Sequence, residues 1–567
     1  MTPQLILGPI LRYTGPQDAT IWVETDAACE VEVRIKDSSH RSQTFHVEGH
    51  HYALVHVEDL KPGNSYEYEV ALAGEQAWPE PNSGMPSVIR TLDVEATFRL
   101  AFGSCRVAVP HRPPYTLNGE ESSKGYDVDA LHALALRMRQ QPPEEWPDAL
   151  LLLGDQIYAD EVSVGTLEFI RSRRDTSQPP GEEVADFQEY THLYLDSWGE
   201  PSIRWLLSTV PTAMIFDDHD VNDDWNISAA WIEKMRAKPW WDQRITSGLM
   251  SYWIYQHLGN LSPEDLSKNE LLARVKEADD AGPLLREFAR RADRDPEEVR
   301  WSFHRDFGET RLVVVDSRAG RMLKEGQRLM VDEQEWDWVE RHATGGFDHL
   351  LIGTSLPLIL APGIHHFEAW NEAVCAGAWG ARAAQVGELI RQTVDLEQWP
   401  AFHKSFNRFA GLLRSIAAGE RGDPPASIAV LSGDVHHTYL AQLELRDPDA
   451  RSPVYQATCS PFRNPLPRVL RHIFRAGWSE KGTLAGRLLS RSAGLEEPEI
   501  GWHLTHDGPW FDNHVATLEL EGRRSVLKIE KATSRDGDSE DPILRKIFEY
   551  HLSREDTSAV AAPEGAP

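Results

Sequence analysis

The chain is poor in cysteine. Four of its 567 residues are cysteines, at positions 29, 105, 375 and 459, and no two of them form a C-x-x-C pair. Domains that depend on disulfides use many closely spaced cysteines. A disulfide framework is therefore excluded, and a reducing compartment fits the cysteine content best.

Long hydrophobic runs are also missing. No uninterrupted apolar stretch approaches the roughly 20 residues that span a bilayer, so no transmembrane segment is predicted. The first residues, MTPQLILGPILRYTG, lack a basic segment, and Pro9 interrupts their short apolar stretch. Such a start is typical of a strand and not of a secretory signal. We expect a cytoplasmic protein, or a secreted one if a signal was removed from this numbering.

Positive charge is scarce as well. The chain has 58 lysine and arginine residues against 89 aspartate and glutamate residues, which gives a net charge of −31. A field of this sign repels nucleic acid and anionic membranes except at local basic patches, and it attracts divalent cations. We therefore expect no nucleic-acid partner. Global disorder is excluded, because hydrophobic residues make up 41% of the chain.

The first 94 residues contain short alternating segments separated by turns. The segments expected as strands are residues 20–24, 29–35, 44–48, 52–60, 65–72 and 87–92. This spacing is typical of a small antiparallel sandwich. The turn LKPGNSY at residues 60–66 resembles one found in fibronectin type III domains. We predict an all-β sandwich of the fibronectin III or immunoglobulin type over residues 1–94.

Residues 95–535 have a different sequence pattern, in which short apolar runs alternate with helical or irregular stretches. The runs expected as strands are residues 98–104, 148–155, 211–218, 310–317, 349–355, 427–434, 453–458, 514–520 and 525–532. A helix is expected near residues 128–139. Strands that alternate with helices predict a layered α/β domain. For residues 536–567 we expect a C-terminal helix and then a disordered tail.

Polar or metal-binding side chains follow four of these strands directly. They stand in the segments FGSCR at 102–106, GDQIYAD at 154–160, DDHDVNDDW at 217–225 and SGDVHH at 432–437. Ligand sites of open α/β sheets lie beyond the carboxyl ends of the strands, so the four segments should meet in space. One such segment alone would indicate a turn, an acidic loop or a core residue. All four together predict a site for several metal ions.

The same four segments, in this order, resemble the PhoD-like alkaline phosphatases. That family is a branch of the calcineurin-like metallophosphoesterases with an N-terminal fibronectin-like domain, and the resemblance covers residues 1 to about 535. It implies an αββα catalytic domain that hydrolyses phosphomonoesters, phosphodiesters or both, through a hydroxide that bridges two metals. The implied partner is a small-molecule phosphate ester. Secreted members carry a twin-arginine signal, which this sequence does not show at its start.

The resemblance also implies roles for single residues. The implied metal ligands are Cys105, Asp155, Tyr158, Asp218, Asp223, Asp434 and His436. Cys105 and Tyr158 would bind Fe³⁺ as thiolate and phenolate, and Asp155 would bridge two ions. Asp434 stands where the superfamily has a histidine, which favours Ca²⁺ as the other ion. Other divalent metals remain possible.

Two further residues are expected to act on the substrate. His219 is the candidate general acid, and Arg106 is placed beside Cys105 to bind phosphoryl oxygens with its planar guanidinium. An ion pair with a site carboxylate is the alternative for Arg106. Asp160 lies beyond the core of its motif, where we expect a surface turn. None of the four segments lies in the sandwich, so we expect metal binding not to require it.

Two other functions stay open at this point. One is a phospholipase-type phosphodiesterase that acts on lipid head groups. An open cleft with an apolar rim would favour this function. The other is a non-catalytic binding protein in which the metal centre is structural.

Overall fold

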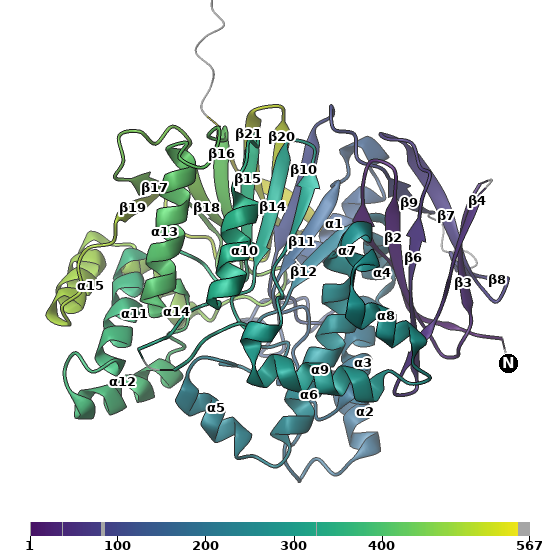
Figure 1. The fold of residues 1–567 in the computed structure, drawn as a ribbon, viewed down its shortest axis with the longest axis horizontal. Helices are drawn as coiled ribbons and strands as arrows, with labels where there is room; N and C mark the ends of the chain where they lie inside the picture. Colours follow the sequence, from purple (N-terminus) through teal and green to yellow (C-terminus); the bar gives the residue numbers. More distant parts are fainter. Residues whose placement is uncertain (1, 37, 81–85, 325, 554–567) are drawn as a thin grey trace, which may run out of the picture.

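The computed structural model describes residues 2–36, 38–80, 86–324 and 326–553 (Figure 1). The N-terminal part is a sandwich of two antiparallel sheets. The first sheet has the order β1 (Leu5–Thr14), β2 (Ala19–Thr25), β6 (His50–Val57) and β5 (Phe45–Val47). The second has the order β4 (Ser38–Gln43), β3 (Glu30–Ile35), β7 (Ser65–Leu72) and β8 (Glu75–Trp78), and β9 (Ser87–Arg90) also pairs with β7. The predicted strands of this part are confirmed within a few residues.

Alternation along these strands explains why the two sheets pack together. Ile21 and Val23 of β2 face Val31 and Val33 of β3, and all four side chains are fully buried. Successive residues of a strand point to opposite faces, so each sheet gives one apolar face to this core.

The part of the chain that follows the sandwich contains two larger sheets. The first sheet has the order β12 (Thr212–Ile215), β11 (Ala149–Leu153), β10 (Phe98–Gly103), β20 (His514–Glu521), β21 (Arg524–Arg535) and β22 (Asp538–His551). The second has the order β13 (Phe303–Phe307), β14 (Thr310–Val315), β15 (His349–Thr354), β16 (Ser427–Ser432), β18 (Val454–Thr458), β17 (Tyr439–Leu445) and β19 (Ile500–Leu504). The pairs β10–β11 and β11–β12 are parallel, as are β14–β15, β15–β16 and β16–β18.

The helices lie outside the two sheets. Between the sandwich and β13 they are α1 (Ala130–Met138), α2 (Val164–Arg173), α3 (Phe187–Trp198), α4 (Pro201–Thr209), α5 (Ala229–Arg236), α6 (Trp241–Ser251), α7 (Pro263–Ser267), α8 (Glu270–Glu277) and α9 (Gly282–Arg294). The later ones are α10 (Glu333–Ala343), α11 (Pro362–Cys375), α12 (Ala381–Thr393), α13 (His403–Ala417), α14 (Arg468–Gly477) and α15 (Glu480–Ser492). None of the helices in the described ranges is long and apolar enough to cross a membrane.

The apolar run of β11 shows how the layers are held together. Leu151 and Leu153 belong to the core between the two sheets, whereas Leu150 and Leu152 belong to the core beneath the helices of the first sheet. A strand that is covered on both faces is therefore apolar at every position. The predicted α/β domain with an αββα arrangement is confirmed.

The prediction for the C-terminal segment is wrong in one respect. Residues 538–551 form the strand β22, which pairs antiparallel with β21, and not a helix. β22 is the edge strand of its sheet and most of its side chains are partly exposed, which is why its sequence lacks a clear apolar alternation. The expected tail at residues 554–567 lies outside the described residues.

Candidate metal centre

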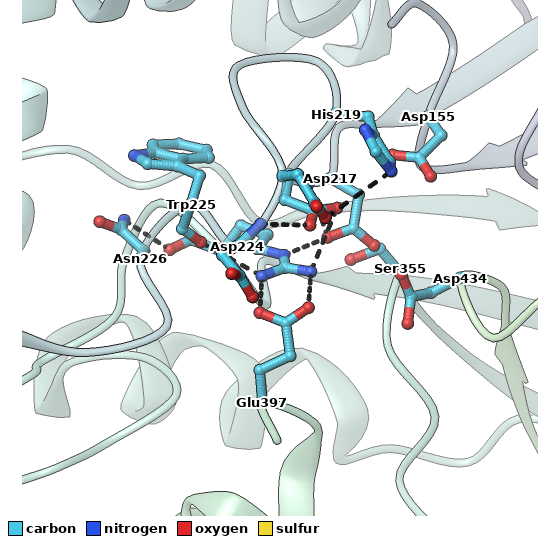
Figure 2. Close-up of polar contacts among 12 residues, drawn as sticks. Asp155, Asp217, His219, Asp224, Trp225, Asn226, Ser355, Glu397 and Asp434 are labelled. Atoms are coloured by element: carbon cyan, nitrogen blue, oxygen red, sulfur yellow. Dashed lines mark hydrogen bonds and ion pairs between the residues drawn. The ribbon is translucent and has the colours of Figure 1, made fainter. Parts of the chain in front are cut away.

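The segments that follow β10, β11, β12 and β16 meet at one edge of the two sheets. The Cys105 N–H donates to the carbonyl oxygen of Gly154 at 3.2 Å, which joins the first two segments. The Asp434 N–H donates to Ser104 Oγ at 3.0 Å, which joins the first segment to the last. Figure 2 shows Asp155, Asp217 and Asp434 around one common space. The convergence predicted from the strand ends is confirmed.

The backbone of this site is strained at several ligand positions. Cys105, Asp155, Asp434 and His436 have φ angles of 54°, 53°, 67° and 49°. Residues other than glycine seldom adopt this left-handed region, and they persist there where the surrounding structure holds them for function. Gly433 allows the close approach of two segments, because a Cβ atom there would lie 2.3 Å from Ser104.

The donor atoms form three overlapping groups, within each of which the atoms lie within 4.8 Å of one another. The groups are Cys105 with Asp155 and His436, Asp155 with Asp218 and His219, and Asp217 with Asp218 and Asp434. Asp155 belongs to the first two groups and Asp218 to the last two. A carboxylate has two oxygens, so Asp155, whose Oδ1 has no hydrogen-bond partner among the described residues, is placed to contact two cations. This geometry suits the bridging role expected for Asp155.

Cys105 and Tyr158 approach the same carboxylate oxygen. Cys105 Sγ lies 3.3 Å and Tyr158 Oη 3.5 Å from Asp155 Oδ2. The amide of Asn464 donates to Tyr158 Oη at 3.1 Å and thereby fixes the phenol. The thiol and the phenol expected to bind one ion are thus side by side, and both are buried.

The site is electrostatically incomplete on its own. Burial raises the pKa of Asp155, Asp434 and the Cys105 thiol well above their ordinary values, and neighbouring acidic groups raise each of them further. Asp155 Oδ1 and Asp217 Oδ2 are buried without a hydrogen-bond partner among the described residues. Unpaired buried oxygens are costly, and bound cations would satisfy them and reverse the pKa shifts. The residues therefore fit a metal centre.

A fully buried arginine, Arg318, holds part of the cluster. Its guanidinium binds Asp217 and Glu397, and Nη2 lies 3.3 Å from Asp218 Oδ1 (Figure 2 labels Asp217 and Glu397). Burial opposes its charge, but these three carboxylates outweigh burial and raise the pKa of Arg318 above its ordinary value. Arg318 thus remains charged and fixes the two aspartates that follow β12.

His219 is oriented by Asp160. His219 Nδ1 lies 2.9 Å from Asp160 Oδ1, and Asp160 Oδ2 also accepts a hydrogen bond from the backbone N–H of Asp223. The Asp160 side chain is 9% exposed, so the expected surface turn is wrong. The reason is that the loop after β11 folds back onto the loop after β12, where the Ala159 N–H donates to the carbonyl of His219 at 2.8 Å.

Nearby carboxylates favour the charged form of the His219 imidazole. Burial lowers the pKa of His219, but the carboxylates of Asp160, Asp155 and Asp218 outweigh it and raise the pKa well above the ordinary value. The ring also packs on Tyr158, with centroids 4.6 Å apart. Figure 2 shows His219 next to Asp155 at the edge of the cluster.

Besides Tyr158, the predicted site residues Arg106 and Asp223 lie outside the three donor groups. Arg106 donates from Nε to Asp129 Oδ2 at 2.8 Å and from Nη1 to the carbonyl of Ser197 at 2.9 Å, so its ion-pair partner is Asp129 and not an oxygen of the cluster. This placement does not match the expected contact with phosphoryl oxygens. The Asp223 side chain is 62% exposed, and its Oδ1 lies 3.9 Å from His219 Nε2 at the rim of the site.

Comparison with protein families identifies the catalytic part. The family described as PhoD-like phosphatase matches residues 132–464, which is more than half of the chain. The chain belongs to the PhoD-like phosphatase family. A second match, to a domain of unknown function (DUF7800), covers residues 2–89, the sandwich. The family predicted from the four motifs is confirmed.

One solved structure shares the fold of this chain. The structure titled "Structure of PhoD" is 12% identical and aligns with a TM-score of 0.55 over 97% of this chain and 90% of that chain, so the two share a fold. The maltogenic amylase from S. marinus is 10% identical over 96% of this chain and 81% of that chain, but its TM-score of 0.14 is too low to indicate a shared fold. No curated protein matches this chain.

Membership of the family makes this protein a phosphoric ester hydrolase. The non-catalytic alternative is therefore set aside. PhoD-like phosphatases depend on metals, and the three donor groups provide candidate ligands for them.

The sequence alone did not identify several residues that form this PhoD-like site. They are Asp160, Asp217, Asp220, Arg318, Glu397 and Asn464. Asp220 Oδ2 accepts hydrogen bonds from the backbone N–H groups of Asp155 and Asp217 at 3.1 and 3.0 Å, and so joins two loops. The DSR segment at residues 316–318, directly after β14, is the one sequence signal that could have pointed to Arg318.

Proposed function

We propose that this hydrolase cleaves phosphomonoesters, phosphodiesters or both at a centre of Fe³⁺ and Ca²⁺. The proposed ligands are Cys105, Asp155, Tyr158, Asp218, Asp434 and His436, with Asp217 added from the geometry and Asp223 at the rim. The observation that carries the proposal is the position of Asp155. It belongs to two donor groups and has a buried oxygen without a hydrogen-bond partner among the described residues.

The two ends of the cluster differ in chemistry. Cys105 and Tyr158 offer a thiol and a phenol at one end, which suit an oxidised iron. Asp217, Asp218 and Asp434 offer only carboxylates at the other end, and these suit a hard cation such as Ca²⁺. When bound, such metals neutralise phosphoryl oxygens and supply an activated water for the attack on phosphorus.

The chain itself supplies the proton for the leaving group. Asp160 occupies Nδ1 of His219, so Nε2 is the nitrogen that can donate to the departing oxygen. The carboxylates around the ring support a protonated imidazole. Arg106 takes a positioning role in this proposal, because its contacts with Asp129 and Ser197 fix the backbone next to Cys105.

The test compares an aryl phosphate monoester and an aryl phosphate diester, each with and without a chelator. We expect hydrolysis of at least one ester, its loss with the chelator, and its recovery after Fe³⁺ and Ca²⁺ are returned. Asp155→Asn should abolish turnover and lower the metal content, whereas Asp175→Asn on the surface should do neither. Full activity in the chelated protein, or a normal metal content in Asp155→Asn, would contradict the proposal.

A further inference from the structure

The helices α14 and α15 expose an unusual group of aliphatic side chains. Val469, Ile473, Leu484 and Leu488 are 74%, 54%, 60% and 59% exposed, and Leu470 is exposed as well. Basic side chains flank them on the same two helices, and on α14 Arg471 and Arg475 lie over the ring of Phe511. We call this region the α14–α15 surface, and its residues are Val469, Leu470, Ile473, Leu484 and Leu488 with Arg468, Arg471, Arg475, Lys481, Arg487 and Arg491.

The charge of this surface is opposite to that of the chain. Residues 468–492 contain six basic residues and one acidic residue, in a protein with a net charge of −31. Arg468 pairs with Glu120, and Arg487 and Arg491 share Glu497 at 3.3 and 3.0 Å. These two carboxylates leave an excess of positive charge on the two helices.

The way α14 is attached turns its apolar residues outward. The ring of Phe474 packs on His437 with centroids 4.5 Å apart, and Arg475 lies over Phe511 at 4.9 Å. Val469 and Ile473 are four positions apart, on one face of the helix, and that face is exposed. The helix begins four residues after Asn464, whose amide binds the Tyr158 phenol, and Phe474 contacts the residue that follows His436, so α14 lies near the metal centre.

We propose that the α14–α15 surface docks the protein on a membrane that contains anionic lipid. Helices with exposed aliphatic residues among arginines bind at the interface of such membranes, where the apolar side chains enter the acyl boundary and the arginines meet lipid phosphates. The inference goes beyond the proposed function, because docking requires neither metals nor turnover. It would place the centre at the lipid–water interface.

Other occupants fit this surface less well. A symmetric contact with a second copy would bring the same arginines against one another, which like charges oppose. A nucleic acid offers phosphates but no apolar phase for the five exposed aliphatic side chains. An anionic lipid surface satisfies both the charge and the apolar area.

Co-sedimentation of the full chain with vesicles tests the proposal. The probes are vesicles of phosphatidylcholine alone and vesicles of phosphatidylcholine mixed with phosphatidylglycerol. We expect binding to the mixed vesicles, weaker binding at high salt, and little binding to phosphatidylcholine alone. The double variant Arg471→Gln/Arg475→Gln should lose affinity by about fivefold per arginine. Val469→Ser/Ile473→Ser should also lose affinity for the mixed vesicles, although its charge is unchanged.

The control removes the same charge elsewhere. Arg523 and Arg524 lie at the turn between β20 and β21, far from α14 and α15 (Figure 1). Arg523→Gln/Arg524→Gln should bind as the unchanged protein does. Hydrolysis of a water-soluble aryl phosphate, measured on every variant, reports folding independently of docking. If the variant with two arginine substitutions does not fold, vesicle binding by Val469→Ser/Ile473→Ser still tests the proposal.

Three results would overturn the proposal. The first is equal binding to both kinds of vesicle, and the second is an equal loss in the control and in the Arg471→Gln/Arg475→Gln protein. The third is a dimer in sedimentation velocity that Val469→Ser/Ile473→Ser disperses, which would assign the surface to self-association. A chain that docks normally but hydrolyses no ester would refute the proposed function and leave this inference standing.

Discussion

Asp160 accepts a hydrogen bond from His219 at 2.9 Å, and this contact fixes which nitrogen of the imidazole faces the cluster. With Nδ1 engaged, the proton available to a substrate is the one on Nε2. The pair has the geometry of a general acid and its orienting carboxylate.

The first prediction concerns this pair. His219→Gln should slow hydrolysis of alkyl phosphates by roughly 10²–10⁴-fold, because their leaving oxygens need a proton, and should slow nitrophenyl phosphates much less. Asp160→Asn should show the same dependence with a smaller loss, since it keeps the imidazole but loses its orientation. Steady-state kinetics on a series of leaving groups checks this. An equal loss for all leaving groups would show that His219 acts as a metal ligand only.

The second prediction concerns Cys105. If its thiolate and the Tyr158 phenolate bind Fe³⁺, the protein should be coloured, and Cys105→Ser should bleach it and lower its iron content. Tyr158→Phe should change the colour without emptying the carboxylate end. Cys459→Ser is the matched control, because Cys459 is also buried but belongs to the core between the sheets. Absorption spectra and metal analysis test this prediction. An unchanged spectrum of Cys105→Ser would contradict the assignment of Cys105 as an iron ligand.

The third prediction concerns Arg318. Its removal leaves Asp217, Asp218 and Glu397 buried without their shared cation. Arg318→Met should lower the free energy of unfolding by about 3–5 kcal/mol, measured by urea unfolding with a chelator present. Arg523→Met is the control, since its pair with Asp348 lies at the surface and should be worth less than about 1 kcal/mol. Similar losses in the two variants would mean that Arg318 contributes little to the fold.

The sequence predicts those parts of the site that come directly after strands. Asp155 and Asp434 follow apolar runs that had to be buried, and the carboxyl ends of such strands meet at one edge. This pattern does not predict in which direction the side chain of the following residue points. Arg106 follows Cys105 immediately but binds Asp129, because the strand ends at Gly103 and the chain turns at Cys105, where φ is 54°.

Contacts between loops were beyond prediction for a different reason. Asp160 and Asp220 each join the loop after β11 to the loop after β12, and the loops' sequences give no sign of how they fold over one another. The edge strand β22 was missed because its charged, partly exposed residues lack the alternation of a half-buried strand.

The sandwich is tied to the metal centre by a chain of hydrogen bonds. Arg12 of β1 is fully buried, and its Nη2 donates to the carbonyl of Gln256 at 2.6 Å. The Gln256 side chain in turn donates to Asp220 Oδ1 at 2.9 Å, and Asp220 accepts the backbone N–H of Asp155. Although the sandwich provides none of the predicted ligands, it supports the loop that carries the proposed bridging carboxylate.

The last prediction follows from this connection. Arg12→Met should lower the free energy of unfolding by about 2–4 kcal/mol, because several buried backbone carbonyls lose their donor. It should also weaken metal retention during dialysis against a mild chelator, since Gln256 would no longer hold Asp220 as firmly. Arg34→Met, which removes a partly exposed arginine from the other sheet of the sandwich, should change neither quantity measurably. A destabilised Arg12→Met protein that keeps its metals as tightly as before would show that the sandwich stabilises the fold alone and that the chain through Gln256 does not reach the centre.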